Sequence, residues 1–164
     1  MAIYTKKGDK GQTGTLSGKK ISKSSNLVST IGGVDELNSF LGVIGGFGGI
    51  QSDLFTVNAI LAGSKINFSK SKITKLEKEI DSLEKTLPKQ KSFIFYGGSP
   101  EAAKLFYARS ICRRAERSLV SLHNSKFVIQ DSILAYINRL SDYLYIKGRE
   151  SNFKAKLPEK SWRV

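Results

Sequence analysis

Apolar residues recur at three- and four-residue spacing in one segment of this chain after another, and this period constrains the fold more than any other feature of the sequence. Such spacing places the apolar side chains on one face of a helix. The predicted helices span approximately residues 26–43, 53–66, 74–87, 100–123 and 131–147. Because short links between long amphipathic helices favour antiparallel neighbours, we expect an all-α, five-helix up-and-down bundle.

The same period predicts which residues form the core. The apolar positions expected inside are, in chain order, Val34, Leu37, Leu41, Ile44, Leu54, Val57, Ile60, Leu61, Leu76, Ile80, Leu83, Leu87, Leu105, Cys112, Ala115, Leu119, Leu122, Ile133, Ile137, Leu140 and Leu144. Pro88 stops the third helix, and Ser99 caps the fourth, which has Pro100 in its first turn. The glycine-rich run 45–49 reads as a flexible connection, because fixing glycine in a helix costs more backbone entropy than fixing other residues.

A chain of 164 residues suits a single domain, and no boundary within it is visible. We expect an N-terminal loop at 1–24, the helical bundle at 25–150 and a loosely held polar tail at 151–164. The longest apolar run, 41–50, is too short to cross a bilayer, and the N-terminus carries no secretory signal. The expectation is a cytoplasmic protein with no membrane partner.

The net charge of +13 is the outlier in the composition. So basic a chain favours nucleic acid, an acidic membrane surface or a phosphorylated small molecule as its partner. One cysteine, Cys112, and one histidine, His123, exclude an intrachain disulfide and a multi-cysteine zinc site, and we expect both residues to be structural. Charge alone does not choose among the anionic partners, so the choice rests on two local patterns.

The first pattern is a row of arginines, Arg109, Arg113 and Arg117, which recur every four residues along the fourth predicted helix. Like charges stacked on one helix face cost on the order of 0.2–0.5 kcal/mol per pair. Their presence indicates that an anion binds there, and a polyphosphate is the candidate. The alternative is a solvated face whose charge is neutralised by Glu116.

The second pattern is a glycine-rich basic loop near the N-terminus. Gly8, Gly11 and Gly14 allow backbone amides to point inward and let the chain approach phosphate oxygens closely. The cations and hydroxyls of this region are Lys6, Lys7, Lys10, Lys23, Thr5 and Thr13. It is not a Walker loop, because only three residues separate Gly14 from Gly18. A plain surface loop is the alternative interpretation.

Four segments are more specific in combination than either pattern alone. They are YTKKGDKG at 4–11, VDELNS at 34–39, RSICRRAER at 109–117 and YINRLSDYL at 136–144. In this order, and spanning almost the whole chain, they resemble the ATP:cob(I)alamin adenosyltransferases of the trimeric, PduO-type helical-bundle class. The resemblance implies a protomer with a ferritin-like four-helix core plus one helix, a homotrimer, and ATP bound between neighbouring subunits.

The activity that this resemblance implies is transfer of the 5′-deoxyadenosyl group of ATP to cob(I)alamin, or to a precursor such as cob(I)yrinic acid a,c-diamide, with release of triphosphate. Cobalt is itself the nucleophile, so the protein needs to supply none. ATP, cobalamin and Mg²⁺ are the implied ligands, and the ion is bridged by phosphates without dedicated protein ligands. A corrinoid reductase or an adenosylcobalamin-dependent enzyme is an implied partner, and nucleic acid is not.

The resemblance also assigns roles to residues. The ATP-binding residues of the loop are Thr5, Lys6, Lys7, Gly8, Thr13, Gly14 and Lys23. Arg109 and Arg113 complete the phosphate clamp, Asn138 positions the nucleotide, and Asp35 pairs with Arg109 across the subunit interface. Phe93 packs against the lower face of the corrin ring and leaves cobalt four-coordinate, which eases its reduction. Without the resemblance, Asn138 is an ordinary hydrogen-bonding residue, Asp35 belongs to an early helical turn, and Phe93 is a core aromatic.

Two positions depart from the family's pattern: Lys7 stands where threonine is common, and Tyr96 stands where proline usually precedes a glycine pair. These changes could alter nucleotide affinity or corrin access. The competing function is a nonenzymatic nucleic-acid binder, which predicts an affinity for oligonucleotides that falls steeply with salt. A third is a bundle that binds ATP or a corrinoid without catalysis.

Overall fold

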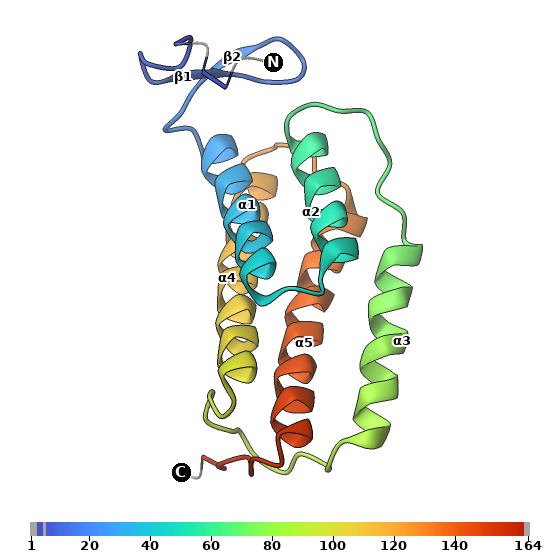
Figure 1. Ribbon diagram of the computed structural model, residues 1–164. Helices are drawn as coiled ribbons and strands as arrows, with labels where there is room; N and C mark the ends of the chain where they lie inside the picture. The colour runs from blue at the N-terminus through green and yellow to red at the C-terminus, as the bar shows by residue number, and fades with distance from the viewer. Residues whose placement is uncertain (1–2, 5, 163–164) are drawn as a thin grey trace.

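The computed structural model describes residues 3–4 and 6–162, and it is mostly helical. Its elements are β1 (Gln12–Gly14), β2 (Lys20–Ser22), α1 (Asn26–Ile44), α2 (Gly48–Leu61), α3 (Ser71–Thr86), α4 (Pro100–Asn124) and α5 (Asp131–Lys154). Successive helices alternate in direction (Figure 1). Helix α2 packs on α1, α1 on α4, α4 on α5, and α5 on α3. The predicted five helices are confirmed.

Helix α4 begins where the sequence predicts, because its first turn is capped. The Ala102 N–H donates to the Ser99 hydroxyl at 3.1 Å, and Pro100 occupies the position where a missing N–H has no cost. The acidic Glu101 lies in the first turn, near the positive end of the helix dipole. Helix α1 begins in the same way, with Ser25 accepting a hydrogen bond from the Val28 N–H at 3.4 Å.

The core lies between the helices, and the residues predicted for it are confirmed as buried or half-buried. Ile44, Ile60, Ile80 and Leu83 are the half-buried ones, packed against the edge of the cluster. Cys112 is fully buried, and its thiol donates to the Ile137 carbonyl at 3.3 Å. Burial raises the pKa of the Cys112 thiol, so this residue is a packing residue and not a nucleophile.

The glycine-rich connection differs from the prediction. Gly48 and Gly49 form the first turn of α2, which therefore begins five residues earlier than residue 53 and ends at Leu61 instead of 66. Phe47 is buried at the corner, and its carbonyl accepts from the Gln51 N–H at 2.9 Å. Gly45, at φ +83°, ends α1 by donating its N–H to the Leu41 carbonyl. The link is a fixed turn, because the packing of Phe47 outweighs the low helix propensity of glycine.

The C-terminal segment also differs. Helix α5 continues to Lys154, beyond the expected end near residue 147, and the following chain is held by hydrogen bonds. The Phe95 N–H donates to the Lys160 carbonyl at 2.9 Å, and the Trp162 N–H donates to the Phe93 carbonyl at 2.7 Å. The prediction of a loosely held tail is therefore wrong through Trp162, and residues 163–164 lie outside the described residues.

The N-terminal segment forms a small antiparallel hairpin beyond the end of the bundle where α1 begins (Figure 1). Strands β1 and β2 pair with Thr13 opposite Ile21. The tip of the hairpin reaches the end of α2, where the Leu16 N–H donates to the Ala62 carbonyl at 2.9 Å. The sequence predicts only a loop here, since three-residue strands leave no readable alternation.

Helix α1 is apolar in composition, but the side that faces away from the core carries mainly polar residues and glycines, and Val43 is its one exposed large apolar residue. Among the described residues it is the one helix long and apolar enough to span a membrane by length and composition, a test that core helices of globular proteins also pass. Its inner side buries Val34, Leu37 and Leu41. Only 28% of its apolar window is buried within this chain, so much of the helix is uncovered.

Candidate functional site

The N-terminal loop is shaped by glycine and by Lys23. The Lys23 N–H donates to the Gly11 carbonyl at 2.9 Å, which closes the loop, and Gly11 adopts φ +74°. The Lys23 amine lies against Gly8, where a Cβ would come within 3.0 Å of Nζ. Folding thus brings Lys23 to the loop, fourteen positions after Asp9. Thr5 lies outside the described residues.

The loop gathers positive charge that nothing in the described chain neutralises. Its cations Lys6, Lys7, Lys10 and Lys23 are all exposed, and none forms an ion pair within residues 3–4 and 6–162. Thr13 is half-buried in β1, and the exposed Gly14 ends that strand. The arrangement suits an anionic ligand, whose charge would offset the repulsion among the lysines.

The arginines on α4 differ among themselves. Arg113 and Arg117 are exposed, whereas Arg109 is half-buried and donates from Nη1 to the Tyr96 hydroxyl at 3.1 Å. The Arg109 guanidinium also lies over two aromatic rings, 5.3 Å from the centroid of Tyr96 and 5.4 Å from that of Tyr145. In the described part of the chain no carboxylate pairs with any of the three arginines.

Asn138 lies beside the arginine row. From α5, its Nδ2 donates at 2.8 Å to Glu116, which lies on α4 three residues after Arg113. Among the described residues Glu116 forms no ion pair with the three arginines, so the alternative in which it neutralises them is not supported by a direct contact. Asp35 is exposed on α1 and forms no ion pair with a described residue.

Phe93 lies in a group of exposed aromatic residues at the end of the bundle where α4 begins. Its side chain is 73% exposed, which excludes a core role within this chain. The Trp162 ring lies edge-on at 6.4 Å, and Phe95 and Tyr96 are also exposed. We call these four residues the aromatic platform. Exposed apolar groups of this size commonly bind an apolar ligand or partner.

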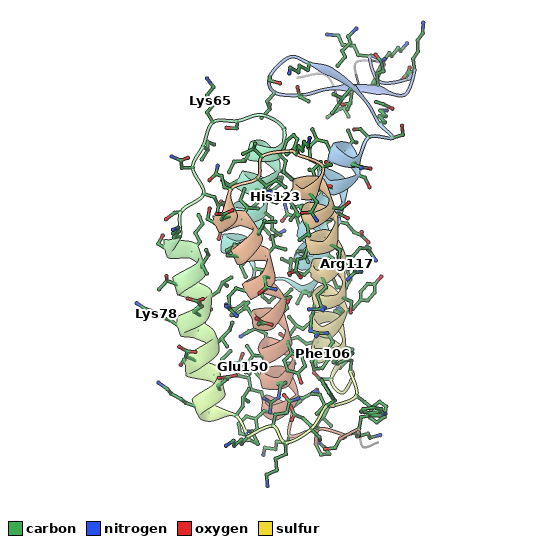
Figure 2. All side chains as sticks on the ribbon, turned by 180° about the vertical axis from the view of Figure 1, so that it is seen from behind. Lys65, Lys78, Phe106, Arg117, His123 and Glu150 are labelled. Carbon is green, nitrogen blue, oxygen red and sulfur yellow. The ribbon has the colours of Figure 1, made fainter. Side chains whose placement is uncertain are left out.

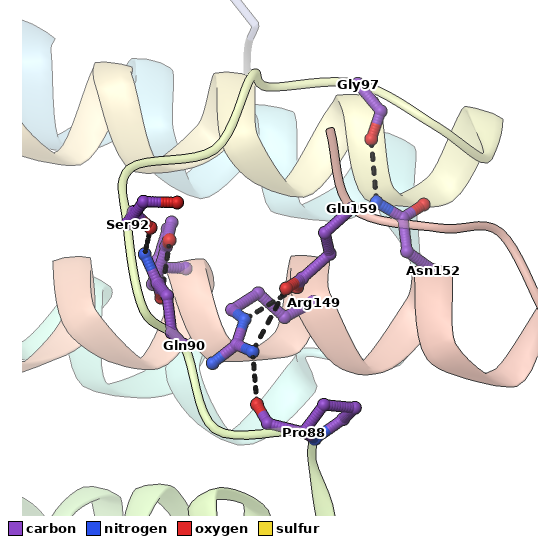
Figure 3. Close-up of polar contacts among 8 residues, drawn as sticks. Pro88, Gln90, Ser92, Gly97, Arg149, Asn152 and Glu159 are labelled. Carbon is purple, nitrogen blue, oxygen red and sulfur yellow. Dashed lines mark hydrogen bonds and ion pairs between the residues drawn. The ribbon is translucent and has the colours of Figure 1, made fainter. Parts of the chain in front are cut away.

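Buried polar side chains fix the segment that carries the platform (Figure 3). Arg149 is 5% exposed, and its guanidinium donates twice to Glu159, at 2.6 and 3.1 Å, and once to the Pro88 carbonyl at 2.8 Å. Asn152 donates to the Gly97 carbonyl at 2.8 Å and accepts from the Ser99 N–H at 2.9 Å. Both side chains come from the last turns of α5.

The sequence does not predict these supporting residues. Nor does it predict that Trp162 lies beside Phe93 or that Tyr145 lies beside Arg109. No motif marks them, and their partners are distant in the chain. The one available signal was the aromatic and glycine content of residues 92–98, which predicted an extended piece without indicating what holds it.

The loop and the arginines lie apart in one chain. The loop lies beyond the end of the bundle where α1 begins (Figure 1). Along α4, Arg117 lies towards that end and Phe106 towards the opposite one (Figure 2). Between the described loop residues and the α4 arginines there is no hydrogen bond or ion pair. Within the described residues a single chain therefore carries two separate groups of cations, the loop lysines and the α4 arginines, which we call the half-sites.

The sequence profile of the cobalamin adenosyltransferase family matches residues 3–151, which is most of the chain. The chain belongs to the cobalamin adenosyltransferase family. The corrinoid adenosyltransferase of Bacillus subtilis strain 168 is 38% identical over 94% of this chain and 89% of that protein. This identity extends along the chain, so the family assignment rests on far more than the loop and the arginines.

Two solved structures of variants of a PduO-type ATP:corrinoid adenosyltransferase from Lactobacillus reuteri share the fold. A phenylalanine-to-histidine variant, complexed with cobalamin and ATP, is 34% identical with a TM-score of 0.92, over 99% of this chain and 97% of that one. An arginine-to-lysine variant, complexed with ATP, is 36% identical with a TM-score of 0.92, over 98% and 100%. The five-helix arrangement is thus that of a cobalamin adenosyltransferase.

Proposed function

We propose that this cobalamin adenosyltransferase transfers the 5′-deoxyadenosyl group of ATP to cob(I)alamin and releases triphosphate. Family membership carries the proposal, and the observation in the structure that supports it most is the arginine row of α4 without carboxylate partners. A row of this kind is suited to a polyanion with several charges.

The proposed reaction requires the protein to stabilise developing negative charge and to position the two substrates. The electron pair of cob(I)alamin attacks the ribose 5′ carbon, the carbon–cobalt bond forms, and the carbon–oxygen bond to triphosphate breaks. Negative charge grows on the departing oxygen, so cations fixed around the phosphates lower the barrier. Cobalt supplies the nucleophile, and the buried Cys112 is unavailable for that role.

We assign the nucleotide grip to both half-sites. Lys6, Lys7, Gly8, Thr13, Gly14 and Lys23, with Thr5, hold ATP from the loop. Arg109 and Arg113 bind the phosphates from α4, and Asn138, placed beside them by Glu116, positions the nucleotide. Within the described residues no three or more His, Cys, Asp or Glu side chains gather, so Mg²⁺ would be held mainly by phosphate oxygens.

Because the half-sites lie apart in one chain, we assign them to neighbouring subunits of a homotrimer built from ferritin-like four-helix cores, each with one added helix. Asp35, exposed on α1, then pairs with Arg109 of the neighbouring subunit. Much of α1 is uncovered within this chain, which leaves this helix and its exposed Asp35 free to form an interface with another subunit. Sedimentation equilibrium should give three times the mass of the chain.

At the other substrate, we propose that Phe93 packs on the lower face of the corrin ring and keeps cobalt four-coordinate. Its 73% exposure leaves the ring free for such a contact. Phe93→Ala should lower turnover roughly 100-fold by misplacing the corrin, and leave ATP affinity nearly intact. The four-coordinate spectroscopic signal should fall with it. Phe153→Ala, which removes an exposed phenylalanine of α5 outside the platform, is the control. An unchanged spectrum in Phe93→Ala would refute the role.

One experiment separates the proposed function from its competitors. The protein is incubated with ATP, Mg²⁺ and chemically reduced cobalamin, and the absorption spectrum of adenosylcobalamin is followed. Only the enzyme forms the new carbon–cobalt bond, whereas a carrier binds without it and a nucleic-acid binder does neither. The reaction also implies its partners, a corrinoid reductase before it and an adenosylcobalamin-dependent enzyme after it.

A further inference from the structure

Arg109 links the two proposed substrate sites through one neighbouring residue, Tyr96. Arg109 belongs to the proposed phosphate clamp, and Tyr96 lies three residues after Phe93 in the segment that carries the aromatic platform. The Arg109 Nη1 donates to the Tyr96 hydroxyl at 3.1 Å, and the guanidinium lies 5.3 Å from the Tyr96 ring centroid. A hydrogen bond and a cation–π contact thus join the same two residues.

The Tyr96 ring is supported from beneath. It packs against Phe106, with centroids 5.2 Å apart, and against Tyr145 at 6.4 Å. Phe106 is 2% exposed and rests on Gly148, where a Cβ would come within 2.8 Å of the ring. Tyr145 is anchored by its hydroxyl, which donates to Gln90 at 2.9 Å. The Arg109 guanidinium therefore lies over a fixed aromatic surface.

This contact leaves Arg109 able to bind phosphate. A guanidinium has five N–H donors in a rigid plane, and the bond to Tyr96 uses one of them. Contacts with ring faces use none. The proposed pair with Asp35 of the neighbouring subunit takes up to two more, and the remaining donors are left for phosphate oxygens. The fixed plane lowers the side-chain entropy lost when they bind.

We propose that Tyr96 is a positioning residue that couples the two substrate sites: nucleotide phosphates held by Arg109 fix Tyr96, and through it the segment that presents Phe93 to the corrin ring. The inference rests on the proposed function and adds to it an energetic link between the substrates. Thermodynamic linkage makes the effect mutual: bound corrinoid raises the affinity for ATP by the same factor by which bound ATP raises the affinity for corrinoid.

The test uses cob(II)alamin, which does not accept the adenosyl group without a reductant. Its dissociation constant is measured spectroscopically with and without Mg-ATP, and the ratio of the two constants is the coupling. In the wild-type protein we expect Mg-ATP to lower the dissociation constant of cob(II)alamin at least about fivefold, which is the low end of typical couplings. Tyr96→Phe keeps the ring and removes the hydroxyl, and should lower the ratio about threefold.

Two readouts separate coupling from a structural role. In Tyr96→Phe, the ATP dissociation constant measured in the presence of cob(II)alamin should rise by the same factor. A loss of fold would instead also lower the affinity for each ligand measured without the other. Tyr107→Phe removes the hydroxyl of another exposed tyrosine, on the helix of Arg109, and should keep the wild-type ratio. A Tyr96→Phe ratio equal to wild type overturns the inference while the proposed function stands. Failure of the wild-type protein to bind either ligand overturns both.

Discussion

The two ends of the bundle are built differently. The aromatic platform is tied down by side chains of α5, with Arg149 and Asn152 almost fully buried beneath it. The loop at the other end is held mainly by backbone bonds of its own, such as Lys23 to Gly11, and by one bond from Leu16 to the end of α2. Its lysines extend into solvent.

The proposed function assigns the corrin ring to the platform and the triphosphate to the loop, and the difference between the two ends suits that assignment. A flat, rigid corrin ring is best met by a surface that already has its shape, because little ordering then remains to oppose binding. A flexible triphosphate can be enclosed by a loop with few buried contacts, of the kind that opens at low energetic cost. We therefore expect stability to depend on the platform end and nucleotide affinity on the loop end.

The largest effect on stability should follow from Glu159→Ala. It would leave the buried Arg149 guanidinium, whose side chain is 6% exposed, without its carboxylate. Removing one partner of such a pair costs about 3 kcal/mol of unfolding free energy. Glu77→Ala, which breaks a surface pair with Arg139, is the matched control and should cost less than about 1 kcal/mol. Equal losses of unfolding free energy for the two variants, measured by urea unfolding, would contradict the claim that stability depends on the platform end.

Arg113→Ala should lower kcat about 100- to 1000-fold by removing a cation from the leaving triphosphate. Its melting temperature should stay near that of the wild type, because Arg113 is exposed and has no ion-pair partner among the described residues. The neighbouring Arg114 is paired with Glu36 at 2.5 Å, and Arg114→Ala is expected to keep kcat. Steady-state kinetics check this, and equal losses in both variants would remove Arg113 from the clamp.

Of these three substitutions, Lys23→Ala should have the smallest effect, with almost no change in stability and a moderate loss of ATP affinity. The amine is exposed beside Gly8, so we expect the unfolding free energy to change by no more than about 0.5 kcal/mol. ATP affinity, measured by calorimetry, should fall about tenfold, the loss of one charge-assisted contact. Lys65→Ala, an exposed lysine of the α2–α3 link, should keep wild-type affinity. An ATP affinity unchanged in Lys23→Ala would mean that the loop holds the nucleotide without this cation.

Most of the fold could be predicted from the sequence, because the helical period is a local property. Helix α4 agrees within a residue, since Ser99 and Pro100 mark its start. The start of α2 could not be predicted, because what overrides the glycines at 48 and 49 is the burial of Phe47 against other helices. The end of α5 was missed for the same reason: polar residues such as Asn152 read as exposed until their partners are known.

For the proposed site, the sequence indicates residues that form contiguous patterns and does not indicate the side chains that support them from distant parts of the chain. The loop and the arginines form local patterns, and family resemblance added Asn138, Asp35 and Phe93. The supports of the platform join residues far apart, 55 positions between Asn152 and Gly97 and 61 between Arg149 and Pro88. A sequence pattern within one helix does not indicate such partners.

The central claim is that the loop of one subunit and the arginine row of another grip the same triphosphate, and mixed trimers test it most directly. Arg113→Ala and Lys23→Ala protomers are co-expressed in equal amounts, so a quarter of the sites, roughly, combine a native loop with a native arginine row. With ATP held well below its dissociation constant, the account predicts that about a quarter of the wild-type adenosylation rate returns, well above either variant alone. A mixture no more active than the mean of the two variants would contradict it.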